Sequence, residues 1–422
     1  MARKRQYFGT DGVRGVVGED LTPALVELLG RAFARWADGE PVLIGRDTRS
    51  SGRELEGALA QGLASGGSDV VLGGMLPTPA VALLAESYSA VVSASHNPPE
   101  YNGVKLFASL GRKLVDAEEE AIESLLDAPA SGSGRVRKEE GLAERYVELV
   151  VERFGADLSG LRLAVDCANG AMSEVAPEAF RRLGADVVAV ATQPDGTNIN
   201  VRCGATDLSL VSSVARVERC SLGVAFDGDG DRVLAVDADG NPIDGDQIVA
   251  ILALHLGVDL VAVTSMTNLG FHALMQERGV RVVTTDVGDR YVLEALRREG
   301  GVLGGEQSGH VVYLRDHVTG DGLAAALLLC RSLEGRTLAE AASVMPRYAQ
   351  VKENVRVARK ALPDRLLLEV EQVNAELGEK GRVLVRISGT EPVVRVLAEG
   401  PDSLTASTLC ARIVALVRRE LG

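Results

Sequence analysis

The organisation of this chain follows from residues 41–72, which read PVLIGRDTRSSGRELEGALAQGLASGGSDVVL. The mainly apolar stretches 41–44 and 69–72 predict short strands, and the segment 51–65 between them predicts a helix. Strand, helix and strand in this order are typical of parallel or mixed sheets with helices on both faces. We therefore expect an α/β protein.

The same order of elements begins again further along the chain. A strand is predicted at 90–92, and strands at 161–165 and 260–264 each open a new unit. The last part is shorter, with strands predicted at 351–357 and 382–387 and helices at 364–377 and 404–421, an order that suits an α+β domain. We expect three similar α/β domains with mixed sheets flanked by helices, followed by a smaller C-terminal α+β domain. Their expected bounds are 1–154, 155–246, 247–350 and 351–422.

Composition limits the partners of the protein. The chain has 422 residues and a formal net charge of −14, which argues against nucleic acid, because binding to a phosphate backbone needs a basic face. Its five cysteines show no CxxC spacing, and their odd number leaves no complete disulfide framework. The N-terminal residues lack the apolar segment of a signal peptide, and the sequence has no uninterrupted run of about 18 apolar residues, the length of a membrane-spanning helix. We expect a cytoplasmic protein without membrane contact, either a monomer or a homodimer.

A serine lies in the loop after the strand predicted at 90–92. The segment SASHNP occupies residues 93–98, and Ser95 is its second serine. An exposed serine at this position is a candidate for a covalent intermediate, because the nucleophile must be within reach of a substrate. Most serines in such turns only cap the turn, so this motif alone leaves both interpretations open.

Three carboxylates alternate with glycines between two apolar stretches. The residues Asp227, Asp229 and Asp231, with Arg232 after them, can converge on one hard cation, since the glycines let the backbone bend. An EF-hand loop is excluded, because Arg232 stands where that loop needs glycine and Ala238 where it needs glutamate. An acidic surface turn is the alternative, but three unpaired carboxylates beside buried strands would repel one another. Oxygen ligands favour Mg²⁺.

A glycine-rich loop, GGEQSGH, occupies residues 304–310. Glu306, Ser308 and His310 in such a loop are suited to hydrogen bonds with sugar hydroxyls, and a polar turn between strands is the alternative. The nucleophile elbow G-x-S-x-G is absent, because Glu306 stands two positions before Ser308.

A second polar turn lies near the C-terminus. Arg386 and Arg395 flank the residues Ser388, Gly389 and Thr390. The backbone N–H groups of such a turn, two hydroxyls and a guanidinium form a nest for anions, and the paired arginines favour phosphate.

Other basic residues occur in glycine-rich segments of the N-terminal part. Arg14 lies in FGTDGVRG, residues 8–15, and Lys105 follows Ser95 by ten positions. A lone arginine or lysine is more often a solvated surface charge. The chain has neither a Walker A loop nor G-x-G-x-x-G, so nucleotide-driven chemistry is unsupported.

Taken in this order, the motifs resemble those of the α-D-phosphohexomutases, from Phe8 to about Glu399. Within that family the chain is most similar to the bacterial phosphoglucosamine mutases. The finer similarity rests on residues 8–15, 195–200, 287–290 and Gln307, where relatives acting on other sugars usually carry methionine. Val318 departs from the pattern, because relatives often have a threonine there.

The resemblance implies a role for each motif. Ser95 would carry a phosphoryl group, and the metal would bind this phosphoserine and the three aspartates. Glu306 and Ser308 would contact sugar hydroxyls, and Arg386, Ser388, Gly389, Thr390 and Arg395 would bind the distal phosphate. The charge stabilisers or proton-transfer groups are expected to be Arg14, Lys105 and His310, with His96, Arg232 and Arg290 in support.

The resemblance also implies a reaction. A phosphoserine enzyme with Mg²⁺ would interconvert glucosamine 6-phosphate and glucosamine 1-phosphate through a 1,6-bisphosphate. Glucosamine or glucose 1,6-bisphosphate would serve as activator, and the product would feed the synthesis of UDP-N-acetylglucosamine and of the cell wall. Phosphomannomutase or phosphoglucomutase activity is the nearer alternative, and a non-catalytic sugar-phosphate binding protein is the alternative from another class.

Overall fold

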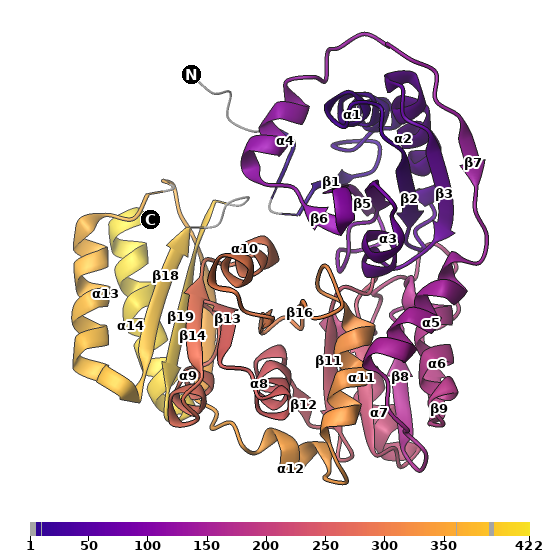
Figure 1. Ribbon diagram of the computed structural model, residues 1–422. Helices are drawn as coiled ribbons and strands as arrows, with labels where there is room; N and C mark the ends of the chain where they lie inside the picture. Colours follow the sequence, from indigo (N-terminus) through magenta and orange to yellow (C-terminus); the bar gives the residue numbers. More distant parts are fainter. Residues whose placement is uncertain (1–5, 10, 360, 388–391) are drawn as a thin grey trace. The chain divides into compact units, whose positions relative to one another are not determined.

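The computed structural model describes residues 6–9, 11–359, 361–387 and 392–422 (Figure 1). Its contacts divide the chain into two compact units. The first unit extends to Met266 and continues over Val280–Ser343, and the second combines Thr267–Gly279 with Val344–Gly422. Among the described residues, three sheets belong to the first unit and one to the second.

The N-terminal sheet is mixed, as expected. Its strands lie in the order β1-β5-β4-β2-β3-β7, with β6 paired to β5. The strands are β1 Val13–Val16, β2 Val42–Arg46, β3 Val70–Met75, β4 Tyr88–Val92, β5 Tyr101–Ala108, β6 Arg112–Lys113 and β7 Val136–Lys138. The helices are α1 Pro23–Trp36, α2 Gly52–Gly66, α3 Thr78–Leu84 and α4 Asp116–Glu123. All of Val42–Gly45 is buried, so both faces of β2 are covered.

The second sheet has the order β12-β11-β10-β8-β9. Its strands are β8 Arg162–Asp166, β9 Asp186–Val190, β10 Leu222–Phe226, β11 Val233–Asp237 and β12 Pro242–Ile243. The accompanying helices are α5 Leu142–Phe154, α6 Met172–Arg182 and α7 Ser209–Val217. Strand β8 runs parallel to β9 and β10, whereas β10 and β11 form an antiparallel hairpin.

The third sheet has the order β14-β13-β15-β16. Its strands are β13 Leu260–Thr264, β14 Arg281–Thr285, β15 Leu303–Gly305 and β16 Val311–Tyr313. The helices of this part are α8 Gly245–Leu256, α10 Asp289–Glu299, α11 Gly322–Ser332 and α12 Leu338–Ala342. Strands β14 and β15 run parallel to β13, and β15 and β16 are antiparallel.

The three sheets share one topology, which explains the threefold repetition of the sequence. In each, a central strand has two parallel neighbours, and one of these turns into an antiparallel hairpin, giving β3-β2-β4-β5, β9-β8-β10-β11 and β14-β13-β15-β16. The hairpin loops are residues 93–100, 227–232 and 306–310. Ser95, the three aspartates and Glu306 thus occupy the same position in three repeated units.

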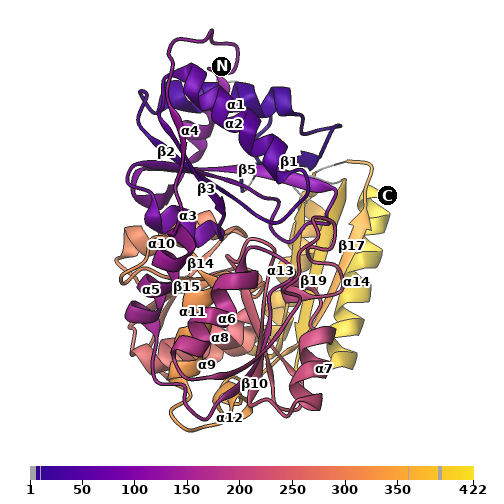
Figure 2. The same cartoon turned by 90° about the vertical axis from the view of Figure 1, so that its right-hand side faces the viewer.

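The second unit is the expected smaller α+β domain. Its antiparallel sheet has the order β17-β19-β18. The elements are α9 Leu269–Glu277, β17 Ala349–Arg356, α13 Asp364–Leu377, β18 Arg382–Ile387, β19 Val393–Gly400 and α14 Ser403–Leu421. Helices α13 and α14 cover the sheet, and Figure 2 shows α14 running along it. None of the described helices is both long and apolar enough to cross a membrane.

Helix α9 belongs to this second unit, although its sequence lies inside the segment expected to form the third domain. The Asn268 side chain before the helix donates to the carbonyl of Tyr348 at 2.9 Å, and the backbone N–H of Leu269 donates to Glu399 at 3.2 Å. These contacts hold the start of α9 against residues that lie 80 and 130 positions further along the chain. The four domain bounds stay predictions.

A pH dependence follows from His272 on α9. Burial, together with Arg382, lowers the pKa of His272 from 6.5 to about 4, so the folded unit binds this proton less readily than the unfolded chain. The corresponding stability is complete above pH 6.5 and is lost as the pH falls toward 4. Between pH 8 and pH 4.5, the free energy of unfolding of the second unit should therefore fall by about 2 kcal/mol less in His272→Gln than in the original chain. Hydrogen exchange of α9 at pH 8 and 4.5 measures this, and equal acid sensitivity of both chains would contradict it.

Candidate active site

Ser95 lies where two parallel strands of the first sheet end together. Strands β2 and β4 are neighbours, with Arg46 opposite Val92, so their carboxyl ends meet at one edge of the sheet. The expectation of an exposed serine was wrong, because Ser95 is only 1% exposed. Gly228 of the aspartate loop packs on its backbone, so closely that a Cβ on Gly228 would lie 2.6 Å from the carbonyl oxygen of Ser95.

The hydroxyl of Ser95 contacts the aspartate loop directly. It donates a hydrogen bond to Asp227 Oδ2 at 2.6 Å and lies 3.2 Å from His96 Nδ1. Burial, followed by the charges of Arg232 and Arg14, lowers the pKa of His96 to about 4, so this imidazole is neutral at neutral pH. Ser95 has a φ of 53°, a left-handed conformation that costs a residue with a Cβ about 1–3 kcal/mol.

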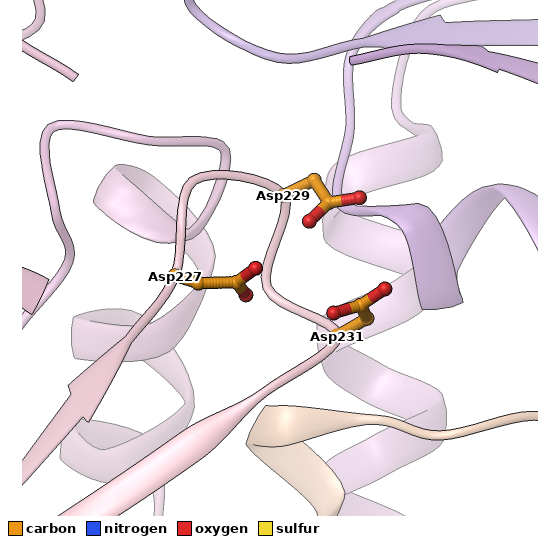
Figure 3. Close-up of side chains that lie close together, drawn as sticks. All are labelled: Asp227, Asp229 and Asp231. Carbon is orange, nitrogen blue, oxygen red and sulfur yellow. The ribbon is translucent and has the colours of Figure 1, made fainter. Parts of the chain in front are cut away.

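Asp227, Asp229 and Asp231 come together in the hairpin loop between β10 and β11. Each offers an oxygen, and these oxygens all lie within 4.8 Å of one another. Figure 3 shows the three aspartate side chains close together on this one loop. Burial, reinforced by repulsion from Asp231 and Asp229, raises the pKa of Asp227 well above its ordinary value. The surroundings of Asp227 therefore disfavour its charged form.

Lys105 supplies one positive charge to the cluster from β5. Its Nζ donates to Asp229 Oδ2 at 2.7 Å and Asp231 Oδ2 at 2.9 Å, and lies 3.0 Å from Asp11 Oδ2. Burial by itself would lower the pKa of Lys105, but these three carboxylates raise it well above its ordinary value. The side chain is 2% exposed, so Lys105 is a buried cation of the site and not a solvated surface charge.

Lys105 belongs to a closed ring in which acidic and basic side chains alternate, here called the ion-pair ring. Its members, in order, are Asp231, Lys105, Asp11, Lys113, Asp289 and His310. Lys113 Nζ lies 2.9 Å from Asp11 Oδ1 and also bonds to Asp289. His310 Nε2 and Nδ1 lie 3.4 Å from Asp289 Oδ2 and 3.7 Å from Asp231 Oδ1. Burial would lower the pKa of His310, but Asp289 and Asp231 raise it.

The aspartate cluster fits a divalent cation. Asp229 Oδ1 is buried and accepts no hydrogen bond from any described residue, which leaves one oxygen of a buried carboxylate unsatisfied. Hard oxygen donors of this kind suit Mg²⁺ or Ca²⁺. The cluster can therefore hold a metal through Asp227, Asp229 and Asp231, next to the hydroxyl of Ser95.

The loop of residues 306–310 closes the hairpin between β15 and β16. Glu306 and His310 are buried, whereas Ser308 is exposed. Burial, with the nearby charge of Asp289, raises the pKa of Glu306, and Gly288 N–H donates to its carboxylate at 3.2 Å. The loop connects two antiparallel strands and carries one buried carboxyl group and one exposed hydroxyl, and its contact with sugar hydroxyls stays a prediction.

The three arginines predicted to act in or near the site, Arg14, Arg232 and Arg290, contact different partners. Arg14 bonds to Asp11 of the ion-pair ring and lies 3.5 Å from the carbonyl of Ala94. The backbone N–H of Arg232 donates to Asp227 at 3.2 Å. Arg290 is paired with two acids of α4, Asp116 at 2.7 Å and Glu119 at 3.2 Å.

Arg386 and Arg395 lie in the second unit. They are direct cross-strand partners on β18 and β19, so their side chains emerge on the same face of the sheet. Their cross-strand position therefore brings two positive charges to one face of the sheet. Ser388, Gly389 and Thr390 lie outside the described residues.

Several site residues were not singled out from the sequence. Asp11 and Asp289 lie inside segments that were quoted for the resemblance, but nothing in the pattern marked them as partners of a lysine. Lys113 had no signal, because its acids are 102 and 176 positions away in the chain. Thr78, whose hydroxyl donates to Asp229, was also missed.

Comparison with known proteins gives matches over nearly the whole chain. Four models of phosphoglucomutase/phosphomannomutase domains match, the α/β/α domains I, II and III at residues 5–132, 144–240 and 244–348, and the C-terminal domain at 340–416. Two similar proteins are phosphoglucosamine mutases. That of Pelotomaculum thermopropionicum is 47% identical, covering 97% of this chain and 98% of the relative. That of Saccharopolyspora erythraea is 48% identical, covering 98% and 99%.

Solved structures show the same fold. A phosphoglucomutase/phosphomannomutase family protein from Burkholderia thailandensis has a TM-score of 0.85 and 27% identity, covering 98% of each chain. N-acetylphosphoglucosamine mutase from Aspergillus fumigatus, solved with GlcNAc-6P and magnesium, has a TM-score of 0.69 and 19% identity, covering 99% of this chain and 96% of the other. The second similarity concerns the fold alone.

Proposed function

Because the chain belongs to the phosphoglucomutase/phosphomannomutase family, we propose that it is a phosphoglucosamine mutase, interconverting glucosamine 6-phosphate and glucosamine 1-phosphate. The observation that carries the proposal is the contact of Ser95 Oγ with Asp227 at 2.6 Å, inside a cluster of three buried carboxylates. The nearly full-length identity to two enzymes of that name supports the choice of sugar.

Ser95 carries the phosphoryl group in this proposal. The Ser95 Oγ–P bond breaks as a sugar hydroxyl takes the phosphoryl group, which gives a 1,6-bisphosphate. The bisphosphate turns end for end, and its other phosphate returns to the same serine. A phosphoserine brings about −1.5 to −2 charges beside three aspartates, which explains why this loop needs cations.

The protein supplies one of these cations itself, and its three aspartates offer ligands for another. Lys105 is held as an ammonium group by Asp11, Asp229 and Asp231, so it offsets negative charge throughout the transfer. The three aspartates, with phosphorylated Ser95, would hold Mg²⁺, which would supply positive charge to the phosphoryl group.

Two further motifs bind the sugar phosphate in this proposal. Glu306 and Ser308 contact the sugar hydroxyls, and Arg386 and Arg395 bind the phosphate that is not reacting. The cross-strand pairing of these arginines supports an anion site. The same phosphate site serves both orientations of the bisphosphate.

We place the enzyme in the cytoplasm. All five cysteines are free and buried, which suits a reducing compartment. Glucosamine or glucose 1,6-bisphosphate remains the proposed activator, and monomer or homodimer the proposed oligomeric state.

A coupled assay tests the proposal. With Mg²⁺ and a catalytic amount of glucose 1,6-bisphosphate, glucosamine 6-phosphate should give a higher kcat/KM than glucose 6-phosphate or mannose 6-phosphate. A higher value for glucose or mannose phosphate would identify the phosphoglucomutase or phosphomannomutase alternative. Binding without turnover of all three sugars would identify a binding protein.

A further inference from the structure

Two side chains hold the same two carbonyl groups of the serine loop, residues 93–100. The carbonyl oxygen of Ser95 accepts hydrogen bonds from Arg49 Nη2 at 3.0 Å and Asn200 Nδ2 at 2.9 Å. The carbonyl oxygen of Asn97 accepts from the same two groups, at 2.8 Å and 3.1 Å. A carbonyl oxygen has two lone pairs, so Arg49 and Asn200 together saturate both acceptors.

Arg49 is committed entirely to this loop and to Asp47. Its side chain is 0% exposed. Besides the bonds from Nη2, its Nη1 donates to the carbonyls of Pro98 and, at 2.8 Å, Tyr101, and its Nε donates to Asp47 at 2.9 Å. A guanidinium has five N–H donors, and each one has an acceptor here. The shape of residues 95–101 is thus matched to one arginine.

Asp47 extends the same network to the other side of Ser95. Its Oδ2 accepts from the hydroxyl of Ser93 at 2.6 Å, and that hydroxyl oxygen accepts from the backbone N–H of Ser95 at 2.9 Å. The backbone of Ser95 is therefore held at its N–H and at its carbonyl. This double attachment offsets the cost of its left-handed conformation, with φ at 53°.

Asn200 reaches the serine from the part of the chain that carries the second sheet. Its backbone N–H donates to the carbonyl of Ala168 at 2.9 Å, which anchors it to the loop after β8. A Cβ on Gly228 would lie 3.0 Å from Asn200 Nδ2 and 2.6 Å from the carbonyl oxygen of Ser95. The side chain of Asn200 therefore lies beside both the carbonyl of Ser95 and the backbone of Gly228 in the aspartate loop.

We propose that Arg49 and Asn200 are positioning residues that hold Ser95 Oγ at one point for both halves of the phosphoryl exchange. This inference rests on the proposed function, since it acts through the phosphorylation of Ser95. The same oxygen must receive a phosphoryl group from either end of the bisphosphate, and a displacement of about 1 Å costs about 100-fold in rate.

The variant Asn200→Gly tests the proposal most directly. Asn200 has a φ of 59°, which glycine adopts readily, so this change removes the side chain without straining the backbone. The rate constant for transfer from glucose 1,6-bisphosphate to Ser95, followed by intact mass in single-turnover experiments, should fall about 100-fold. The KM for glucosamine 6-phosphate should stay within about twofold, because the residue does not touch the sugar in this proposal.

Two further variants separate positioning from packing. Asn200→Asp keeps the shape of the side chain but replaces the donor with an acceptor that faces two carbonyls. Its rate constant for transfer to Ser95 should be at least as low as that of Asn200→Gly. If Asn200 only filled space, Asn200→Asp would keep the original rate constant. Arg49→Lys has fewer donors for the four carbonyls and should also slow the transfer, with a second phosphoserine signal in the ³¹P spectrum because the loop is no longer fixed.

Asn198→Ala is the matched control. The Asn198 side chain bonds within its own loop, to Gln193 and Asp195 at 2.9 and 3.0 Å. It should transfer at the original rate. Equal losses in Asn198→Ala and Asn200→Gly would overturn the proposal, and so would wild-type rates in Asn200→Gly and Asn200→Asp. Failure of the unaltered protein to acquire a phosphoryl group would instead overturn the proposed role of Ser95.

Discussion

Ser95→Ala is expected to lower the interconversion of the two glucosamine phosphates by about 10⁴-fold or more. Without Oγ no phosphoryl group can be stored on the protein, so neither half of the exchange can proceed. The variant should fold, because the network of Arg49 and Asn200 holds the backbone of Ser95. Its intact mass should not change after incubation with glucose 1,6-bisphosphate, whereas that of the unaltered protein should increase by one phosphoryl group.

Ser89→Ala is the matched control for this experiment. Ser89 lies on β4, buried in the strand that leads to Ser95, and its hydroxyl has no hydrogen-bond partner among the residues that the structure describes. It should therefore keep the turnover and the phosphorylation of the unaltered protein. Undiminished turnover of Ser95→Ala without any protein-bound phosphate would exclude the phosphoserine mechanism.

Much of the fold could be predicted from the sequence, because local patterns define its elements. The helix predicted at 364–377 and the strand predicted at 382–387 are α13 and β18 to the residue. Strand β5 was missed, because Asn102, Gly103 and Lys105 are poor strand residues by type. All but its first residue are buried between neighbouring strands, so tertiary packing overrides local preference there.

The candidate site was predictable to the extent that it is local in the sequence. The three aspartates occupy a stretch of five residues in one hairpin loop, so their spacing alone indicated a cation site. The ion-pair ring could not be derived in this way. Its lysines lie on β5 and β6 of the first sheet, whereas Asp231 and Asp289 come from a loop and a helix more than a hundred positions further along the chain, so only the tertiary structure brings these groups together. The burial of Ser95 was missed for the same reason, since Gly228 that covers it comes from another repeat.

Lys105→Met is expected to destabilise the first unit in the absence of divalent cations by about 3–5 kcal/mol. Methionine has a similar length but no charge. Asp229, Asp231 and Asp11 would then lose the ammonium group that lies 2.7–3.0 Å from each of them. Asp229 and Asp231 are almost completely buried, so water cannot replace this partner. Removing one member of a buried charge cluster leaves the remaining charges uncompensated, which is why the expected loss is large.

Urea unfolding followed by the fluorescence of Trp36 measures this effect, since Trp36 is the one tryptophan of the chain and lies in the first unit. Mg²⁺ should stabilise Lys105→Met more than the unaltered protein, because binding to the folded aspartate cluster removes the same repulsion. Lys138→Met, at an exposed position on β7, should stay within about 0.5 kcal/mol of the original chain. A Lys105→Met protein as stable as Lys138→Met without Mg²⁺ would show that the three carboxylates do not depend on this lysine for their charge balance.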